Sequence, residues 1–238
     1  MSAPLVASAT DFAAVAPRSV QVFTAGFAEV DFAGAALQER LVAICRQAGM
    51  RLVGPNALGL LNPQANFYAT FSTALNGLRP RPGVIGMATQ SGAFGSAAYG
   101  MATLRGIGLS RVIATGNEAD VDVAECIDYL AGDTDTRVIC AALEACKDGA
   151  RLRAALRKAA AAAKPVIIMK IGRTEVGAAA AATHTGSLAG NDAIYDAVFA
   201  ECGAYRAGSI EEMLDVAHLC AVCGELPANE RIGVMTGS

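Results

Sequence analysis

The hydrophobic pattern of this chain alternates short β-rich runs with longer segments of helical periodicity. The run at 84–89 (VIGMAT) and the nearly continuous apolar run at 165–170 (PVIIMK) are typical of strands buried on both faces. We expect strands at 19–24, 50–53, 84–89, 111–115, 138–143, 165–170 and 204–206, and helices at 33–48, after Ser91, and at 123–131, 150–163, 192–202 and 210–223. Alternation at this spacing predicts a doubly wound α/β layer with a parallel sheet.

The same pattern looks incomplete at both ends of the sequence. Residues 1–62 hold about two strands and one helix, too little for an independent core, and a loop-rich stretch then runs to Pro82. Residues 231–236 (RIGVMT) read as a strand with no helix after it. We therefore expect one whole domain at 78–222, preceded by the C-terminal part of another at 1–62 and followed by a linker and first strand at 223–238.

Composition excludes several functional classes. Of the 238 residues, 53% are hydrophobic and only 17% are charged, so intrinsic disorder is not expected. The net charge of −3 argues against a broad nucleic-acid-binding face. The seven cysteines are an odd number and are scattered through apolar segments. They favour buried thiols in a reducing compartment, the cytoplasm, over a disulfide framework.

The mean hydropathy of +0.39 makes a membrane span worth testing. The stretches 52–78 and 82–104 carry no formal charge and are long enough to cross a bilayer, which needs roughly 20 helical residues. The first, however, contains Pro55, Asn56 and Asn66, and the second contains Gln90, Ser91 and five glycines. Lipid could not satisfy these polar groups, so we expect no membrane segment.

Ligands of open α/β sheets bind beyond the carboxyl ends of the strands, which directs attention to the loops there. In the loop 89–93 (TQSGA), Ser91 can cap the next helix and Gly92 lets the backbone come close to a ligand. The exposed N–H groups and the helix dipole would favour an anion such as phosphate. The pattern equally fits an ordinary capped turn between a strand and a helix.

Two further loops carry weaker signals. Gly116 and Asn117 form a common turn dipeptide after the strand at 111–115. Glu144 follows the strand at 138–143 (VICAAL). A carboxylate in that position could orient a catalytic group, or it could simply be a solvated strand end.

The loop after 165–170 carries one of only two histidines. His184 lies in polar, glycine-containing sequence at the same predicted sheet edge as Ser91 and Glu144, whereas His218 lies in a helical run where a structural role is expected. A neutral imidazole can attack phosphorus and form a phosphoimidazole. The helix at Ser91 could hold the phosphate oxygens, and Glu144 could fix the imidazole tautomer. Neither a second histidine nor a cysteine cluster shares the loop, so no metal site is expected.

Six segments occur together in one order: RLVGPNALGLLNP, ATQSGAFG, GNEADVD, LEACKDG, KPVIIMKIGRTEVGAAAAATHTGSLAGND and EEMLDVA. Together they resemble the NDP-forming acyl-CoA synthetases, the superfamily that includes ADP-forming acetate–CoA ligase and the α subunit of succinyl-CoA synthetase. The resemblance covers nearly the whole chain. It is most specific in HTGSLAG with KxGRTExG upstream, whereas GPN and QSG are weak signals individually.

The resemblance implies a role for each matched position. His184 matches the histidine that carries the phosphoryl group, and Glu144 matches the carboxylate that hydrogen-bonds its ring. The remaining matches are the phosphate-holding helix N-terminus at Ser91, Gly92 and Ala93, the loop beside the CoA thiol at Gly54, Pro55 and Asn56, and supporting loop positions at Gly116, Asn117, Lys170, Arg173, Thr185, Gly186 and Ser187.

The resemblance also implies a fold, a reaction and partners. Residues 1–62 would be the second half of a Rossmann-like CoA-binding domain and 78–222 a flavodoxin-like domain. The implied reaction of the intact enzyme is acid + CoA + ATP ⇌ acyl-CoA + ADP + phosphate. ATP or ADP with Mg would bind an ATP-grasp domain or subunit that is not in this chain, so the isolated chain is expected to be inactive and the enzyme an oligomer.

Two alternatives stay open at this point. The fold could serve as a non-catalytic regulatory module that responds to CoA or acyl-CoA. A flavin-binding flavodoxin is least favoured, because Trp is absent and aromatic residues are sparse at the predicted strand ends.

Overall fold

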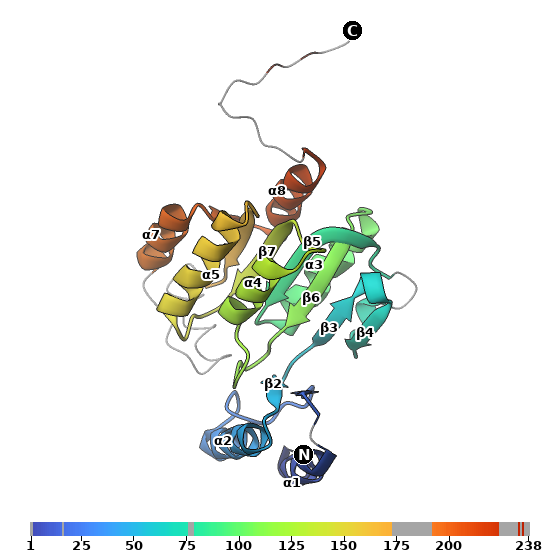
Figure 1. The fold of residues 1–238 in the computed structure, drawn as a ribbon, viewed down its shortest axis with the longest axis vertical. Coiled ribbons are helices and arrows are strands. Elements are labelled where there is room, and N and C mark those ends of the chain that lie inside the picture. The colour runs from blue at the N-terminus through green and yellow to red at the C-terminus, as the bar shows by residue number, and fades with distance from the viewer. Residues whose placement is uncertain are drawn as a thin grey trace.

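The computed structural model describes residues 2–15, 17–75, 79–172 and 192–223, together with Gly233 and Met235. Within these ranges the chain forms a small N-terminal unit and a larger α/β unit, which lie next to each other (Figure 1). Apart from Gly233 and Met235, the strand expected at 231–236 lies outside the described residues.

The larger unit is built on a seven-stranded sheet. Its strands are β3 (Gly59–Asn62), β4 (Phe67–Thr70), β5 (Pro82–Thr89), β6 (Leu109–Ala114), β7 (Val138–Leu143), β8 (Val166–Lys170) and β9 (Tyr205–Arg206), in the order β4-β3-β6-β5-β7-β8-β9. The five strands from β6 to β9 in that order are parallel, while β3 pairs antiparallel with both β4 and β6. The parallel part has the flavodoxin-like order 2-1-3-4-5. The predicted doubly wound, flavodoxin-like fold is confirmed.

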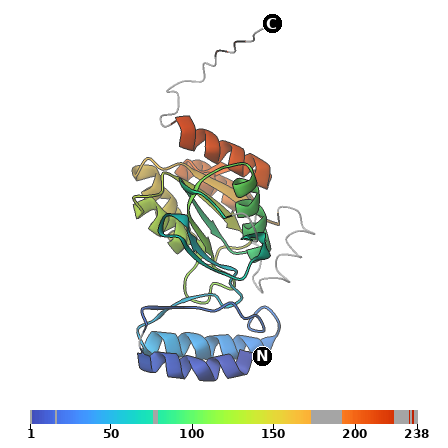
Figure 2. The same cartoon turned by 90° about the vertical axis from the view of Figure 1, so that its right-hand side faces the viewer.

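Helices cover both faces of this sheet (Figures 1 and 2). Helices α4 (Val123–Gly132), α5 (Gly149–Ala161) and α7 (Asp192–Cys202) pack on one face, and α3 (Gly92–Leu104) and α8 (Ile210–Cys223) pack on the other. Side chains of β7 alternate between the layers, since Ile139 and Ala141 join the α4 cluster whereas Cys140 joins the α3 cluster. Burial on both faces explains why the strands read as continuous apolar runs.

The N-terminal unit contains α1 (Ser2–Val15), β1 (Ser19–Gln21), α2 (Phe32–Gln47) and β2 (Arg51–Val53). β1 and β2 pair in parallel, and Phe27, Leu41 and Leu52 are fully buried between the elements. Helix α1 lies beside α2 (Figure 2) and was not predicted from the sequence. It has neither an acidic residue in its first turn nor a basic residue in its last, so the usual end signals are missing.

The stretch between β2 and β5 differs from expectation. It was expected to be mostly loop, but it contains the β3–β4 hairpin and the short 3-10 helices η1 (Pro63–Ala65) and η2 (Thr73–Leu75). The hairpin turn uses Asn62, whose side chain caps η1, and Asn66, whose φ of 51° places it in the left-handed region that asparagine tolerates. β3 belongs to the sheet of the larger unit, and the predicted domain boundary at residue 62 falls at the end of this strand. The division of the chain into domains stays a prediction.

The structure bears on the possible membrane span and on the state of the cysteines. No helix in the described ranges is long and apolar enough to span a membrane, and the uncharged stretch 82–104 is divided between β5 and α3. All seven cysteines are free thiols. Cys45, Cys126, Cys140 and Cys202 are buried as expected, whereas Cys223 is exposed at the end of α8.

Candidate functional site

The candidate site lies where the carboxyl ends of β6, β5 and β7 meet in the middle of the sheet. Gln90 and Ser91 follow β5, residues 115–120 follow β6, and Glu144 follows β7. The direction of chain winding reverses between β5 and β7, and such switch points are where open α/β sheets bind ligands. The topology therefore brings the three loops after β5, β6 and β7 that the sequence singled out to one edge of the sheet.

Ser91 caps helix α3, as predicted. Its side-chain oxygen accepts the N–H of Phe94 at 3.3 Å, and Gly92 and Ala93 form the first turn of the helix. Gly92 also has a packing role that the sequence did not reveal, because a Cβ placed on it would lie 3.0 Å from the Cβ of Leu58. The α3 N-terminus thus sits against the segment that follows the Gly54–Pro55–Asn56 loop.

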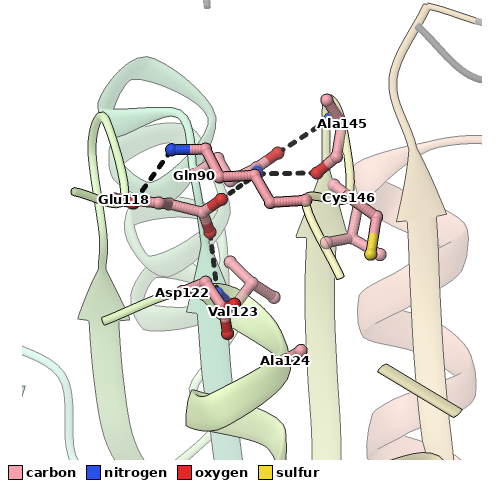
Figure 3. A pocket seen from close by; sticks show the side chains of 9 residues that line it. Gln90, Glu118, Asp122, Val123, Ala124, Ala145 and Cys146 are labelled. Carbon is pink, nitrogen blue, oxygen red and sulfur yellow. Dashed lines mark hydrogen bonds between the residues drawn. The ribbon is translucent and has the colours of Figure 1, made fainter. Parts of the chain in front are cut away.

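The side chain of Gln90 joins the loops after β5 and β7 (Figure 3). Its Oε1 accepts the N–H groups of Glu144 at 2.6 Å and Ala145 at 3.0 Å. Its Nε2 donates to the Ala145 carbonyl at 2.7 Å and to Oε2 of Glu118 at 2.5 Å. Two donated and two accepted bonds fill the capacity of the amide, so its orientation is fixed.

The main-chain N–H and carbonyl of Glu144 are both hydrogen-bonded to side chains. Its N–H donates to Gln90, and its carbonyl accepts the ammonium of Lys170 at 2.8 Å. The residue is only 7% exposed, so the alternative of a solvated strand end is wrong. A buried carboxylate with a fixed backbone is suited to orienting a neighbouring group.

Lys170, the last residue of β8, is also buried. Its ammonium donates to the carbonyls of Glu144 and Ile171 and lies 5.0 Å from the ring centre of Tyr195. Burial lowers the pKa of Lys170, partly opposed by the charge of Asp192. Lys170 therefore ties the end of β8 to the loop after β7.

His184 lies outside the described residues, as do Arg173, Thr185, Gly186 and Ser187. The described chain stops at Gly172, two residues after Lys170, and resumes with α7. The proximity of His184 to Ser91 and Glu144 stays a prediction. The other histidine, His218, is exposed on α8.

The loop expected beside CoA contacts the loop after β6. The Gly54–Pro55 peptide is cis, and the carbonyl of Pro55 accepts the N–H of Asn117 at 2.9 Å. The Asn56 side chain donates to Asn117 Oδ1 at 3.3 Å, and the Gly54 carbonyl accepts the N–H of Ala119 at 3.1 Å. Gly54, Pro55 and Asn56 are thus brought together with Gly116 and Asn117, two of the predicted supporting positions.

Sequence reasoning missed Glu118, which is only 5% exposed. Its Oε1 accepts the N–H of Val123 at 2.7 Å, and its Oε2 accepts Gln90. Burial raises the pKa of Glu118 to about 7, although the hydrogen bonds from Gln90 and Val123 oppose that rise. A carboxyl group with this pKa exchanges protons near neutral pH.

Nothing in the spacing of GNEADVD distinguishes Glu118 from the two aspartates that follow it. In the structure, Asp120 accepts the N–H of Leu52 at 2.9 Å and pairs with Arg51, while Asp122 caps α4. Asp122 is buried as well, but of the three acids it is Glu118 whose carboxylate accepts the Gln90 side chain. Among the described residues, no group of three or more histidine, cysteine or acidic side chains could hold a metal ion.

Comparison with known families decides where this architecture belongs. The model of the succinyl-CoA-ligase-like flavodoxin domain matches residues 82–220, from β5 to α8. This chain belongs to that family. The matched region of this family member contains Gln90, Ser91, Glu118 and Glu144, so the whole candidate site at the switch point lies inside the family domain.

Relatives match beyond the family domain. The chain is 39% identical to the ADP-forming acetate–CoA ligase of Methanocaldococcus jannaschii over 91% of its own length, but it spans only 30% of that relative. It is 38% identical to the α subunit of ADP-forming acetate–CoA ligase II of Pyrococcus furiosus over 93% of its length, and spans 47% of that subunit. The chain therefore covers less than half of either relative.

A solved structure has a similar fold. The dinucleotide-forming acetyl-coenzyme A synthetase 1 of Ca. Korarchaeum cryptofilum, in complex with phosphate and ADP, matches 90% of this chain with a TM-score of 0.82 and 36% identity, over 45% of its own length. The similarity extends from the sequence motifs to the three-dimensional fold.

Proposed function

We propose that this chain is a segment of an NDP-forming acyl-CoA synthetase that works through a phosphohistidine at His184. The observation that carries the proposal is the convergence of the capped α3 N-terminus, buried Glu144 and buried Lys170 at the ends of adjacent strands. The segment that contains His184 follows Lys170 in the sequence. Relatives that are ADP-forming acetate–CoA ligases support the same reaction class.

The proposed reaction divides among the residues of the site. Phosphate, bound by the N–H groups and dipole of α3 at Ser91, Gly92 and Ala93, attacks the thioester carbon of acyl-CoA, and CoA leaves as the thiol. A ring nitrogen of His184 then takes the phosphoryl group from the acyl phosphate and releases the carboxylate. Glu144 holds the proton on the other ring nitrogen, so that the attacking nitrogen keeps its lone pair.

The second half of the reaction needs a nucleotide site. The phosphohistidine passes its phosphoryl group to ADP, which gives ATP and regenerates His184. ADP or ATP with Mg would bind an ATP-grasp domain or partner subunit, and the intact enzyme would be an oligomer. A nucleotide partner is consistent with the similar synthetase structure, which holds phosphate and ADP.

The domain division, the loop beside CoA and the cellular compartment form part of the same proposal. Residues 1–62 contribute to a CoA-binding domain, 78–222 carry the phosphohistidine, and 223–238 lead into a following domain. The Gly54–Pro55–Asn56 loop would lie beside the CoA thiol, next to the loop of Gly116 and Asn117 that it contacts. The protein would act in the cytoplasm.

The experiment is phosphoryl labelling in the enzyme completed with its ATP-grasp module. With labelled ATP and Mg, we expect an acid-labile, base-stable phosphoprotein in the unmodified enzyme. His184→Asn should abolish this label, because the amide is not a nucleophile toward phosphorus. His218→Asn is the matched control, since it changes the other histidine, which is exposed on α8, and the label should remain.

Two outcomes would contradict the proposal. Persistence of the full label in His184→Asn would show that another residue is phosphorylated. CoA binding by calorimetry, together with no phosphorylation of the unmodified enzyme, would favour the regulatory module.

A further inference from the structure

Glu118 lies between the two loops that the proposed reaction uses. On one side, the main chain of Asn117 and Ala119 binds the carbonyls of Pro55 and Gly54. On the other side, the Glu118 carboxylate binds Nε2 of Gln90 at 2.5 Å. Hydrogen bonds and the main chain at residues 117–119 therefore connect the Gly54–Pro55–Asn56 loop through Glu118 and Gln90 to Glu144. Figure 3 shows the part of this path from Glu118 through Gln90 to Ala145.

The neighbours of the Glu118 carboxyl group favour its ionised form. The Val123 N–H and the Gln90 amide both donate to it, and the Thr115 hydroxyl lies 3.2 Å from Oε1. A carboxylate accepts at both oxygens, whereas a protonated carboxyl group has to place its own hydrogen among these donors. Ionisation of Glu118 and a fixed Gln90 amide are therefore coupled.

Charged and titratable groups face Glu118 from the surrounding elements. Lys147, after β7, donates to the Glu118 carbonyl at 2.9 Å, and its charge lowers the pKa of Glu118. Asp122, before α4, raises that pKa, and it is itself paired with Arg151 of α5. The thiols of Cys126 on α4 and Cys146 after β7 also interact electrostatically with Glu118. Burial outweighs these charges, because it is the largest contribution to the pKa of Glu118.

We infer that Glu118 is a positioning residue for Glu144: its carboxylate holds the Gln90 amide, and this amide holds the main chain of Glu144 and Ala145. When Glu118 takes up a proton, the constraint on Gln90 weakens and the loop after β7 loosens. The importance of Glu144 for phosphoryl transfer rests on the proposed function. The hydrogen-bonded connection from Glu118 through Gln90 to Glu144 does not rest on it, and this connection can be measured in this chain alone.

The first experiment is an NMR titration of the uniformly labelled chain from about pH 5 to about pH 9. The backbone amide signals of Glu144 and Ala145 should shift together with the carboxyl carbon of Glu118, with a midpoint near its pKa of about 7. In Glu118→Gln this shift should be lost. Asp128→Asn is the matched control, because the Asp128 side chain on α4 is half-exposed and pairs with Lys158, and the shift should persist.

A second variant breaks the hydrogen-bonded connection between Glu118 and Glu144 without removing the Glu118 carboxyl group. Gln90→Met keeps the length of the side chain but removes both hydrogen-bonding atoms. The Glu118 carboxyl carbon should still titrate, whereas the amides of Glu144 and Ala145 should stop following it. If Glu118→Gln does not fold, this variant and the unmodified chain still decide the question. An unchanged shift in Glu118→Gln, or amides that still follow Glu118 in Gln90→Met, would overturn the inference.

The second experiment measures labelling of the completed enzyme. Glu118→Gln should slow phosphohistidine formation at saturating substrate by up to about 100-fold, since a small misplacement of an orienting group costs that much. It should also flatten the pH dependence of the rate near neutrality, while the KM for CoA stays unchanged. If the unmodified enzyme takes up no label, the proposed function is contradicted, but the NMR result for the connection between Glu118 and Glu144 is not affected. Failure of the proposed function is therefore distinguishable from failure of this inference. Normal rates and an unchanged pH profile in Glu118→Gln would overturn the positioning role.

Discussion

Gly116 and Pro55 approach so closely that no side chain fits between them. A Cβ placed on Gly116 would lie 2.3 Å from the Pro55 carbonyl oxygen, the same oxygen that accepts the N–H of Asn117 at 2.9 Å. The φ of Gly116 is +63°, a left-handed conformation that favours glycine. This contact joins the loop that leaves the N-terminal unit to the loop that follows β6.

Gly116→Ala should therefore weaken the fold at this junction. The left-handed backbone alone costs a residue with a side chain about 1–2 kcal/mol, and the contact with Pro55 adds to that cost. Gly106→Ala is a matched control, since Gly106 has a φ of +70° and nothing within 4 Å of its Cβ position. Urea unfolding should show a larger loss of stability for Gly116→Ala, and equal losses would mean that the Pro55 contact relaxes freely.

Asp120 holds the N-terminal unit against the larger one. Its carboxylate accepts the N–H of Leu52 at 2.9 Å and Nε of Arg51 at 2.8 Å. Burial raises the pKa of Asp120, but the hydrogen bonds from Arg51 and Leu52 outweigh it, so the pKa lies below the usual range. A carboxyl group with a lowered pKa stabilises the fold above its unfolded pKa of about 3.9 and loses that contribution as the pH falls through its folded pKa.

Asp120→Asn should cost on the order of 1 kcal/mol at neutral pH, because Arg51 is half exposed and solvent weakens the pair. The difference from the unmodified chain should shrink as the pH is lowered. Glu125→Gln, which changes another partner of Arg51 but no partner of the Leu52 N–H, should alter the free energy of unfolding by less than about 0.5 kcal/mol. Equal losses for both variants in urea unfolding would contradict a special role for Asp120.

The cap of α3 can be tested for stability and for phosphate binding at once. Ser91→Ala and Asp148→Ala each remove a helix N-cap, on α3 and α5 respectively, and each should cost about 1 kcal/mol. Only the α3 N-terminus is proposed to hold phosphate. Added inorganic phosphate should therefore raise the urea midpoint of the unmodified chain and of Asp148→Ala more than that of Ser91→Ala. The same phosphate response in all three would argue against this site.

The raised pKa of Glu118 predicts a sign for the pH dependence of stability. Burial holds this pKa at about 7, above the ordinary glutamate value, so the folded chain binds this proton more tightly than the unfolded chain. The contribution of Glu118 to stability is therefore complete below the unfolded pKa of about 4.3 and is lost as the pH rises toward 7. The difference in unfolding free energy between the unmodified chain and Glu118→Gln should fall over this interval. A difference that rises with pH would contradict the assignment.

Much of the α/β unit was predictable, because its signals are local. The strand at 138–143 and the helices at 192–202 and 210–223 coincide with β7, α7 and α8 residue for residue. Continuous apolar runs indicate strands buried on both faces, and helical periodicity marks the helices between them. The β3–β4 hairpin was missed, because its place in the sheet depends on antiparallel pairing with β6, about fifty residues later in the chain.

In the candidate site, too, the features set by local sequence were predictable and those set by long-range contacts were not. The sequence by itself determined the alternation of strands and helices from β5 to α8, the Ser91 cap and the family resemblance, since each depends on neighbouring residues or on a motif. The tertiary structure alone decided that Glu118, rather than Asp120 or Asp122, is the acid of its loop that binds the Gln90 side chain. Its Oε2 accepts Nε2 of Gln90, which lies 28 residues away in the sequence and 2.5 Å away in space. Such a contact exists only after the sheet has brought the strand ends together.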